Sequence, residues 1–262
     1  MAKVSPACAL NAISCKIVSS PVASLTRLLK LFTSIAGAAA ALAIIERSVS
    51  VFLNFKKKCQ LLAVLCLLIT SAAVYPHSAP KTILVLGDSL SAEYGLVRGT
   101  GWVALLEKRL AENHINAKLI NASISGETTS GGKARLAALL KQHQAHILII
   151  ELGGNDALRG LDLAASEKNF REMLAMAKAA QAKSLLVAMR IPPNYGKTYS
   201  EQFFAMYAKI AKENQASLVP FFLQGVADKP ELFQADRIHL KAEAHPIMLD
   251  NVWAPLQILL KK

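Results

Sequence analysis

The stretch Ile83-Leu84-Val85-Leu86-Gly87-Asp88-Ser89-Leu90-Ser91 gives the strongest indication of the fold. Its four consecutive apolar residues predict a short buried strand, because the run is too brief for a helix and ends in a turn signal. We expect Gly87 to bend the backbone sharply, since glycine tolerates a positive φ without a Cβ clash. Asp88 and Ser89 then follow at the carboxyl end of the strand, where open parallel sheets collect ligands and reactive groups. Ser89 is a candidate nucleophile or a helix N-cap, and this stretch alone does not separate the two.

Beyond residue 80, short apolar runs alternate with amphipathic stretches. Each predicted strand is followed by a predicted helix, which indicates βαβ units and a parallel sheet covered on both faces. The predicted strands are Thr82–Leu86, Lys118–Ile120, Ile147–Leu152, Leu185–Met189 and Leu218–Val219. The predicted helices are Trp102–Glu112, Gly131–Gln142, Ser166–Ala180, Tyr199–Lys212 and Ala242–Leu260. The sequence therefore predicts one doubly wound α/β domain over residues 80–262, a length sufficient for a single core.

Charge and cysteine are distributed unevenly along the 262 residues. Of the 30 Lys and Arg, 8 precede residue 80, and of the 18 Asp and Glu only 1 does, so the predicted domain is only mildly basic. All four cysteines also precede residue 80, which excludes a disulfide within that domain. The predicted domain contains neither a basic run nor a patch of interleaved aromatic residues, so the sequence argues against nucleic-acid binding.

The region before residue 80 is predicted to carry an export signal. Lys56-Lys57-Lys58 precedes the apolar run Leu61 to Ile69 and then the small residues Ser71-Ala72-Ala73, a pattern typical of a secretory signal peptide over about residues 53–79. Cleavage is expected after Ala73 or Ala79. The run is shorter than the roughly 20 residues of a membrane-spanning helix, so an uncleaved anchor is the alternative. We expect a periplasmic or secreted protein, with membrane contact only through this segment.

A second apolar run, Leu31 to Ile45, follows Arg27 and Lys30. Two such segments in tandem are unusual for one exported protein. We hypothesise that the natural product begins near Val51 or Leu53 and that the upstream part is not translated. The alternative is a membrane-inserted helical hairpin ahead of the domain. Either way, the expected organisation is an N-terminal export region, 1–79, followed by one domain, 80–262.

Three further motifs follow the predicted strands or precede the last helix. Asn121–Thr128 and Glu151–Asp156 both contain glycine-bearing turns that leave a strand at the same edge as Ser89. Asp236 and His239 lie three residues apart, a spacing that places both side chains on one side of a helical turn. The carboxylate can then accept a hydrogen bond from one imidazole nitrogen, while the other takes a proton from a serine hydroxyl. This is the arrangement of nucleophile, base and orienting acid that serine catalysis requires.

In this order and spacing, the motifs resemble those of the SGNH (GDSL) hydrolase family. The matching pieces are Gly-Asp-Ser-Leu at 87–90, Gly126, Gly153-Gly154-Asn155-Asp156 and the pair Asp236 and His239. The likeness runs from about Lys81 to the C-terminus. The stretches 121–126, 139–144 and 193–196 are similar to the bacterial thioesterase I, lysophospholipase and arylesterase subgroup. The resemblance implies a flavodoxin-like three-layer sandwich with a five-stranded parallel sheet, and it favours a nucleophile over an N-cap at Ser89.

The resemblance also implies a role for each matched residue. Ser89 would attack an acyl carbonyl, with His239 as general base and Asp236 holding the imidazole. The backbone N–H groups of Ser89 and Gly126 and the side-chain amide of Asn155 would form the oxyanion hole. No cofactor or metal ion is implied. The expected activity is hydrolysis of small-molecule acyl esters and thioesters, as in arylesterases, acyl-CoA thioesterases and lysophospholipases, by a monomer.

Two other functions fit the same sequence: a carbohydrate O-deacetylase on the same fold, or a non-catalytic module of the cell envelope. For the acyl chain we expect an apolar groove formed by two turns of the active edge. Its residues are Ala157, Leu158, Leu161, Ile191, Pro192 and Tyr195.

Three residues depart from the family pattern. Glu93 stands where close relatives usually have glycine, and Arg237 and Leu240 replace the glycine and proline expected around Ile238-His239. Glu93 is expected near the rim of the site, and the other two in the loop that holds Asp236 and His239. These changes concern substrate preference and pH optimum more than catalysis itself.

Overall fold

The structure is a computed structural model that describes residues 43–51 and 79–261. The chain divides into two units, Met1–His77 and Ser78–Lys262. In the first unit the described residues, 43–51, are helical and exposed. The predicted signal peptide, 53–79, lies almost wholly outside the described residues, as does most of the upstream part, so the export region stays a prediction. No helix within the described ranges is long and apolar enough to cross a membrane.

The second unit is built on a five-stranded parallel sheet with the order β2-β1-β3-β4-β5. The central strand β1 carries the apolar run with which the sequence predicted the fold, and residues Ile83 to Leu86 are fully buried. Such complete burial fits a parallel strand that is covered on both faces. The strands are β1 (Lys81–Gly87), β2 (Ala117–Asn121), β3 (Ile147–Glu151), β4 (Lys183–Val187) and β5 (Ser217–Val219).

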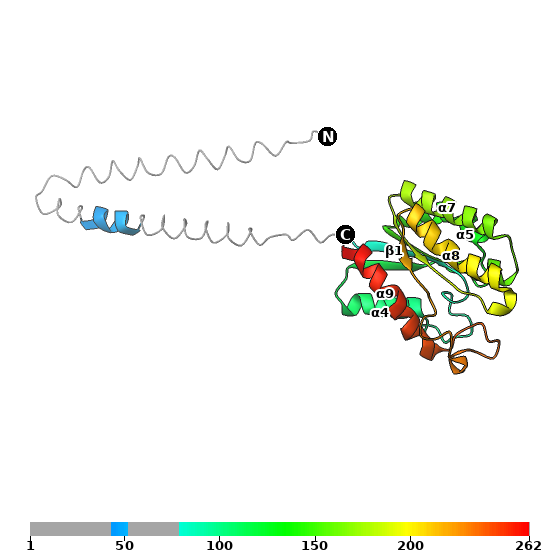
Figure 1. Ribbon diagram of the computed structural model, residues 1–262. Helices are drawn as coiled ribbons and strands as arrows, with labels where there is room; N and C mark the ends of the chain where they lie inside the picture. Colours follow the sequence, from blue (N-terminus) through cyan, green and yellow to red (C-terminus); the bar gives the residue numbers. More distant parts are fainter. Residues whose placement is uncertain (1–42, 52–78, 262) are drawn as a thin grey trace, which may run out of the picture. The chain divides into compact units, whose positions relative to one another are not determined.

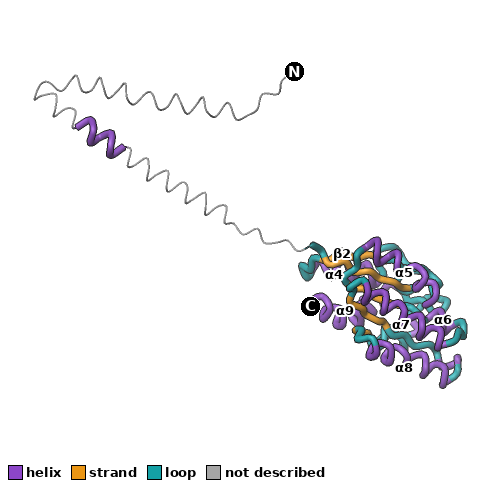
Figure 2. The backbone as a smooth tube through the Cα atoms, turned by 90° about the horizontal axis from the view of Figure 1, so that it is seen from above, coloured by secondary structure: helices purple, strands orange, loops and turns teal. Residues whose placement is uncertain are grey.

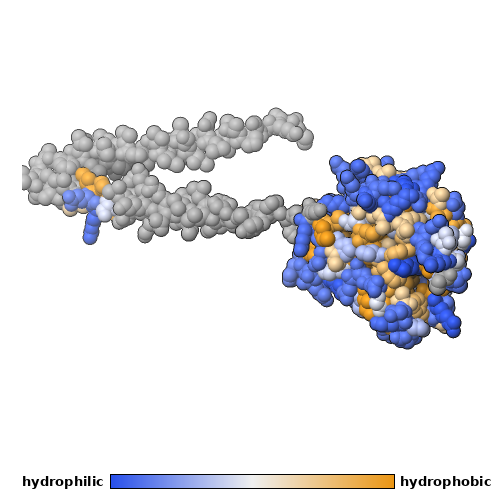
Figure 3. Space-filling model, viewed as in Figure 1, coloured by the Kyte–Doolittle hydropathy of each residue, from blue (hydrophilic) through white to orange (hydrophobic). Residues whose placement is uncertain are grey.

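Helices cover both faces of the sheet, which makes three layers. α5, α7 and α8 lie on one face, and α4 and α9 lie on the other (Figures 1 and 2). In the view of Figure 3 the outer surface over α7 is largely hydrophilic, as expected of the solvent side of an amphipathic helix. The helices are α4 (Trp102–Glu112), α5 (Thr129–His143), α6 (Gly154–Leu158), α7 (Leu163–Ala179), α8 (Lys197–Glu213) and α9 (His245–Lys261), with 3₁₀ turns at Pro193–Tyr195, Pro230–Leu232 and Ala242–Ala244.

The predicted α/β class and the flavodoxin-like strand order are confirmed. Every predicted strand and helix is present, with ends that shift by a few residues, and α4 has the predicted bounds. Two corrections concern element types. The turn predicted at Gly153-Gly154 opens the short helix α6, and the predicted last helix begins with a separate 3₁₀ turn before α9 starts at His245.

The chain turns directly after Gly87, as expected, but the expected positive φ at Gly87 is wrong. It remains the last residue of β1, paired in register with Glu151 of β3. A Cβ at this position would lie 2.6 Å from Ser91 Oγ and 2.9 Å from Glu151 Oε2. Glycine is therefore required here for the close approach of two buried polar side chains.

The topology brings the candidate residues to one edge of the sheet. β1 pairs with β2 on one side and with β3 on the other, so the chain reverses its winding direction beside β1. Ligand sites of open α/β sheets lie at such a switch point, outside the carboxyl ends of the strands. The segments that follow β1, β2 and β3 contain Ser89, Gly126 and Asn155 respectively.

Candidate active site

Three side chains from two distant segments form a continuous line of hydrogen bonds. His239 Nε2 lies 2.8 Å from Ser89 Oγ, and His239 Nδ1 lies 2.6 Å from Asp236 Oδ2. Ser89 follows β1 directly, whereas Asp236 and His239 lie in the turn between the 3₁₀ segment at Pro230–Leu232 and the one before α9. In this geometry His239 can take a proton from Ser89 while Asp236 fixes its tautomer.

The carboxylate of Asp236 is held in its ionised form. Burial opposes ionisation, but hydrogen bonds from the His239 ring and from the backbone N–H groups of His239 and Ile238 outweigh it and lower the pKa of Asp236 to about 2. Both backbone donors lie 3.0 Å from Asp236 Oδ1. The turn therefore keeps a negative charge beside His239 throughout the neutral pH range.

Two backbone donors and one side-chain amide are free to face a developing oxyanion. Within the described residues, neither Ser89 N–H nor Gly126 N–H donates a hydrogen bond to the protein. Asn155, in the first turn of α6, donates from Nδ2 to Asp88 Oδ2 at 3.1 Å, which leaves its second amide hydrogen unused. Gly126 has φ +78, so glycine is favoured there by backbone conformation as well as by access to its N–H.

Two carboxyl groups near Ser89, those of Asp88 and Glu151, are buried. Glu151 Oε2 accepts a hydrogen bond of 2.6 Å from Ser91 Oγ, which in turn accepts one of 3.1 Å from Trp102 Nε1. Burial, together with the neighbouring Asp88, raises the pKa of Glu151 well above its usual range. Burial also raises the pKa of Asp88 to about 6, against the opposing hydrogen bond from the Leu90 N–H. The sequence analysis assigned no site role to Glu151 or Trp102. The available signal for Glu151 was a charged residue at the end of an apolar strand.

Tyr94 is a further residue near the site that the sequence did not indicate. Its ring lies against the His239 imidazole, with centroids 4.2 Å apart and planes inclined by 34°. No sequence pattern relates positions so far apart. Its neighbour Glu93 and the distant Arg237, at both of which the resemblance led us to expect glycine, adopt the left-handed conformation, with φ of 58° and 59°.

The predicted acyl groove needs a correction. Ala157 is fully buried in α6, and Ile191 is only 8% exposed, so both side chains belong to the core. Leu161, Pro192 and Tyr195 are exposed and Leu158 is half-buried. The hypothesis of an apolar binding surface therefore rests on these four residues.

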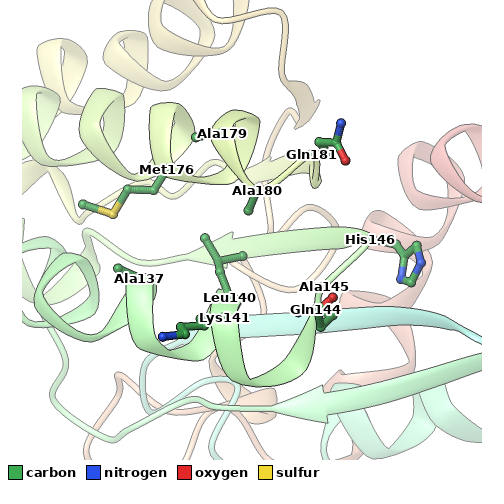
Figure 4. A pocket seen from close by; sticks show the side chains of 10 residues that line it. All are labelled: Ala137, Leu140, Lys141, Gln144, Ala145, His146, Met176, Ala179, Ala180 and Gln181. Atoms are coloured by element: carbon green, nitrogen blue, oxygen red, sulfur yellow. The ribbon is translucent and has the colours of Figure 1, made fainter.

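A separate hollow of about 640 Å³ lies between the C-terminal parts of α5 and α7 (Figure 4). Leu140 and Met176 face it from the two helices, and Ala145 and His146 line it just before β3. This is the amino-terminal edge of the sheet, opposite to Ser89. Among residues 43–51 and 79–261, no three His, Cys, Asp or Glu side chains are grouped as ligands of a metal ion.

Comparison with known proteins identifies relatives of the whole second unit. The model of the GDSL-like Lipase/Acylhydrolase family matches residues 85–247. The esterase TesA of Pseudomonas aeruginosa is 48% identical over 184 residues, which are 70% of this chain and 92% of the relative. Thioesterase 1/protease 1/lysophospholipase L1 of Escherichia coli K12 is 45% identical over 182 residues, 70% of this chain and 86% of the relative.

Solved structures show the same fold. The psychrotrophic esterase EstA from Pseudoalteromonas sp., in a crystal structure inhibited by monoethylphosphonate, superposes with a TM-score of 0.66 at 40% identity. The alignment covers 70% of this chain and all of EstA. Both the sequence match and the fold extend over the strands and turns that bear Ser89, Gly126, Asn155 and His239. The chain therefore belongs to the GDSL-like lipase/acylhydrolase family of ester hydrolases.

Proposed function

We propose that this protein is a serine hydrolase that cleaves acyl esters and thioesters through Ser89, His239 and Asp236. The observation that carries the proposal is the line of hydrogen bonds from Asp236 through His239 to Ser89, with separations of 2.6 and 2.8 Å. Relatives named as an esterase and as a thioesterase and lysophospholipase support the substrate class, which is small-molecule acyl compounds.

The geometry supports a two-step acyl transfer. Ser89 Oγ attacks the carbonyl carbon while its proton passes to His239 Nε2, and Asp236 stabilises the resulting imidazolium. Negative charge on the carbonyl oxygen is received by the N–H groups of Ser89 and Gly126 and by the free amide hydrogen of Asn155. The alcohol or thiol departs with the proton from His239. A water molecule then attacks the acyl carbonyl while its proton passes to His239 Nε2. His239 returns this proton to Ser89 Oγ as the carboxylic acid leaves.

The exposed apolar side chains of Leu161, Pro192 and Tyr195 support an acyl chain as the substrate's non-reacting part. They lie on segments that follow α6 and β4, at the same edge of the sheet as Ser89. An apolar surface with a few polar groups at the reacting end is the usual design of a site for such a ligand.

The test is a substrate series with the parent protein and Ser89→Ala. It compares p-nitrophenyl esters of increasing chain length, an acyl thioester and an acetylated glycan. We expect the parent to hydrolyse aryl esters and thioesters, and Ser89→Ala to lose this activity. Cleavage of the acetylated glycan alone would favour the deacetylase, and equal rates for the two proteins would refute the assignment of Ser89.

We further propose that the domain is exported to the periplasm or secreted, and that it acts as a monomer. Lys56-Lys57-Lys58 and the apolar run that follows support export. All the proposed catalytic groups come from one chain, which supports a monomer. N-terminal sequencing of the exported protein tests the first proposal, with a first residue after Ala73 or Ala79 expected. Light scattering of the active fraction tests the second.

A further inference from the structure

Glu93 connects the two ends of the loop that follows Ser89 and leads to α4. Its Oε1 accepts hydrogen bonds from Gly99 N–H at 3.0 Å and from Gly101 N–H at 2.8 Å. Residue 101 is the N-cap of α4, so one carboxylate ties the start of the loop to the start of the helix. A Cβ at residue 101 would lie 2.6 Å from Glu93 Cγ, which shows how closely the two ends approach. The left-handed backbone of Glu93 directs this closure although the residue is not glycine.

The backbone of Tyr94, the next residue, is hydrogen-bonded to Ser89 and to the segment that contains His239. Its N–H donates to Ser89 O at 3.2 Å, and its carbonyl accepts from Gln234 Nε2 at 3.0 Å. Gln234 also donates from its backbone N–H to His239 O at 2.8 Å and from Nε2 to Leu240 O at 2.9 Å. The backbone of Tyr94 is therefore connected on one side to the nucleophile and on the other to the segment that bears the base.

The ring of Tyr94 covers one face of the His239 imidazole. The centroid separation of 4.2 Å is within contact distance, while the residue remains 50% exposed. In the described part of the chain the Tyr94 hydroxyl makes no hydrogen bond, so the contact with His239 depends on the ring. An imidazole that bonds Ser89 through Nε2 and Asp236 through Nδ1 has only one productive orientation, and a ring packed on its face restricts departure from it.

We propose that Glu93 and Tyr94 form a positioning unit for His239, in which Glu93 fixes the loop and the Tyr94 ring holds the imidazole in line with Ser89 and Asp236. The inference rests on the proposed role of His239 as the general base. Neither residue touches the reacting atoms, so both act on turnover through His239. A ring that instead contacted the acyl group would act mainly on KM.

The test measures kcat and KM on p-nitrophenyl acetate with the full chain. Tyr94→Ala is expected to lower kcat by about tenfold with little change in KM, because a misaligned base penalises the chemical step. Tyr94→Phe keeps the ring and is expected to restore kcat to within about twofold of the parent. Glu93→Ala keeps a non-glycine residue at positive φ but removes the carboxylate, and kcat should again fall. Val97→Ala, in the same loop and 78% exposed, and Glu107→Ala, exposed on α4, are the controls.

A double variant tests whether the two residues act as one unit. If Glu93 acts through Tyr94, its loss adds little in the Tyr94→Ala background, whereas independent effects multiply. The low-field proton resonance of the His239–Asp236 hydrogen bond gives a readout that is independent of turnover. It should persist in Tyr94→Phe and broaden or disappear in Tyr94→Ala when both proteins are folded.

Three results would overturn the proposal: unchanged kcat in Tyr94→Ala, a change confined to KM, or multiplicative effects in the double variant. His239→Ala separates this test from that of the function. If His239→Ala keeps parental activity, the proposed catalytic mechanism fails. If His239→Ala is inactive while folded Tyr94→Ala is as active as the parent, only the positioning unit fails.

Discussion

Asn155 is the one proposed oxyanion donor that mutation can remove without changing the backbone. Asn155→Ala removes the amide proposed to face the developing charge, and loss of one such donor typically lowers kcat by about 10²–10³. The side chain is only partly buried and its one hydrogen bond is to Asp88, so we expect little change in the free energy of unfolding. Steady-state kinetics and urea denaturation of the same preparation measure both effects. A parental kcat would exclude Asn155 from the oxyanion hole.

Arg237 adopts φ +59 in the turn between Asp236 and His239. A non-glycine residue with this φ is strained by about 1–2 kcal/mol, and substitution by glycine removes the strain. Glycine also has more backbone entropy in the unfolded chain, which offsets about 0.5–1 kcal/mol of that gain in stability. Arg237→Gly should therefore raise the free energy of unfolding by about 0.5–1 kcal/mol. Urea denaturation measures the change, and Arg237→Ala, which keeps the strain, is the matched control. A gain of equal size in both variants would point to the loss of the arginine side chain instead.

The motif order was sufficient to select Ser89, Gly126, Asn155, Asp236 and His239, because each stands at a fixed place in a recognisable pattern. The structure brings Ser89, Asp236 and His239 into hydrogen-bonding contact, and their roles stay predictions. Tyr94 could not be found in the same way. Its place beside His239 depends on the path of a loop, and no local pattern in the sequence encodes that path.

Gly153 is the N-cap of α6, two residues before Asn155. It has φ +101, and a Cβ there would lie 2.5 Å from Tyr207 Oη. Tyr207 cannot move away easily, because it is fully buried and donates to Leu152 O at 2.8 Å. Gly153→Ala combines backbone strain with overpacking, each of about 1–3 kcal/mol, so we expect a loss of stability of at least about 2 kcal/mol.

Gly160→Ala is the control for Gly153→Ala. Gly160 also has positive φ, at +64°, but nothing lies within 4 Å of a Cβ there. The difference between the two variants in thermal or urea denaturation reports the contact with Tyr207. Equal losses would mean that backbone strain alone makes glycine necessary at residue 153.

Apolar periodicity was enough to predict the long helices and the strands, because burial against the sheet determines which faces are apolar. It failed at α6, which has only five residues and begins at Gly154, directly after Gly153, and two adjacent glycines favour a turn. α6 exists because tertiary contacts hold it. Asp156 in α6 accepts hydrogen bonds from Thr129 at the start of α5, from both its N–H and its hydroxyl, and from Ser166 of α7.

The stability of the whole domain should depend on pH through Glu151. Burial raises the pKa of Glu151, so the folded protein keeps its proton to a higher pH than the unfolded chain, which releases it near the usual pKa of 4.5. Above that pH the unfolded state binds fewer protons, so the free energy of unfolding falls as pH rises towards the raised pKa. Glu151→Gln cannot ionise and keeps an acceptor for Ser91 Oγ, so its stability should fall less steeply between about pH 5 and 8.

Urea denaturation across this pH range measures the two slopes. Glu107→Gln, at an exposed position on α4, is the control and should reproduce the parental slope. A Glu151→Gln slope equal to that of the parent would show that Glu151 is already ionised in the folded protein.

The fold as a whole serves to bring the turns after three neighbouring strands, and one distant turn before α9, to the same edge of the sheet. We expect this convergence to make Ser89 a nucleophile. Reaction with a fluorophosphonate, followed by mass spectrometry of the digested protein, measures this. We expect one adduct, located on Ser89, and no labelling of Ser89→Ala. Labelling that persists in Ser89→Ala, or an unlabelled active parent, would contradict it.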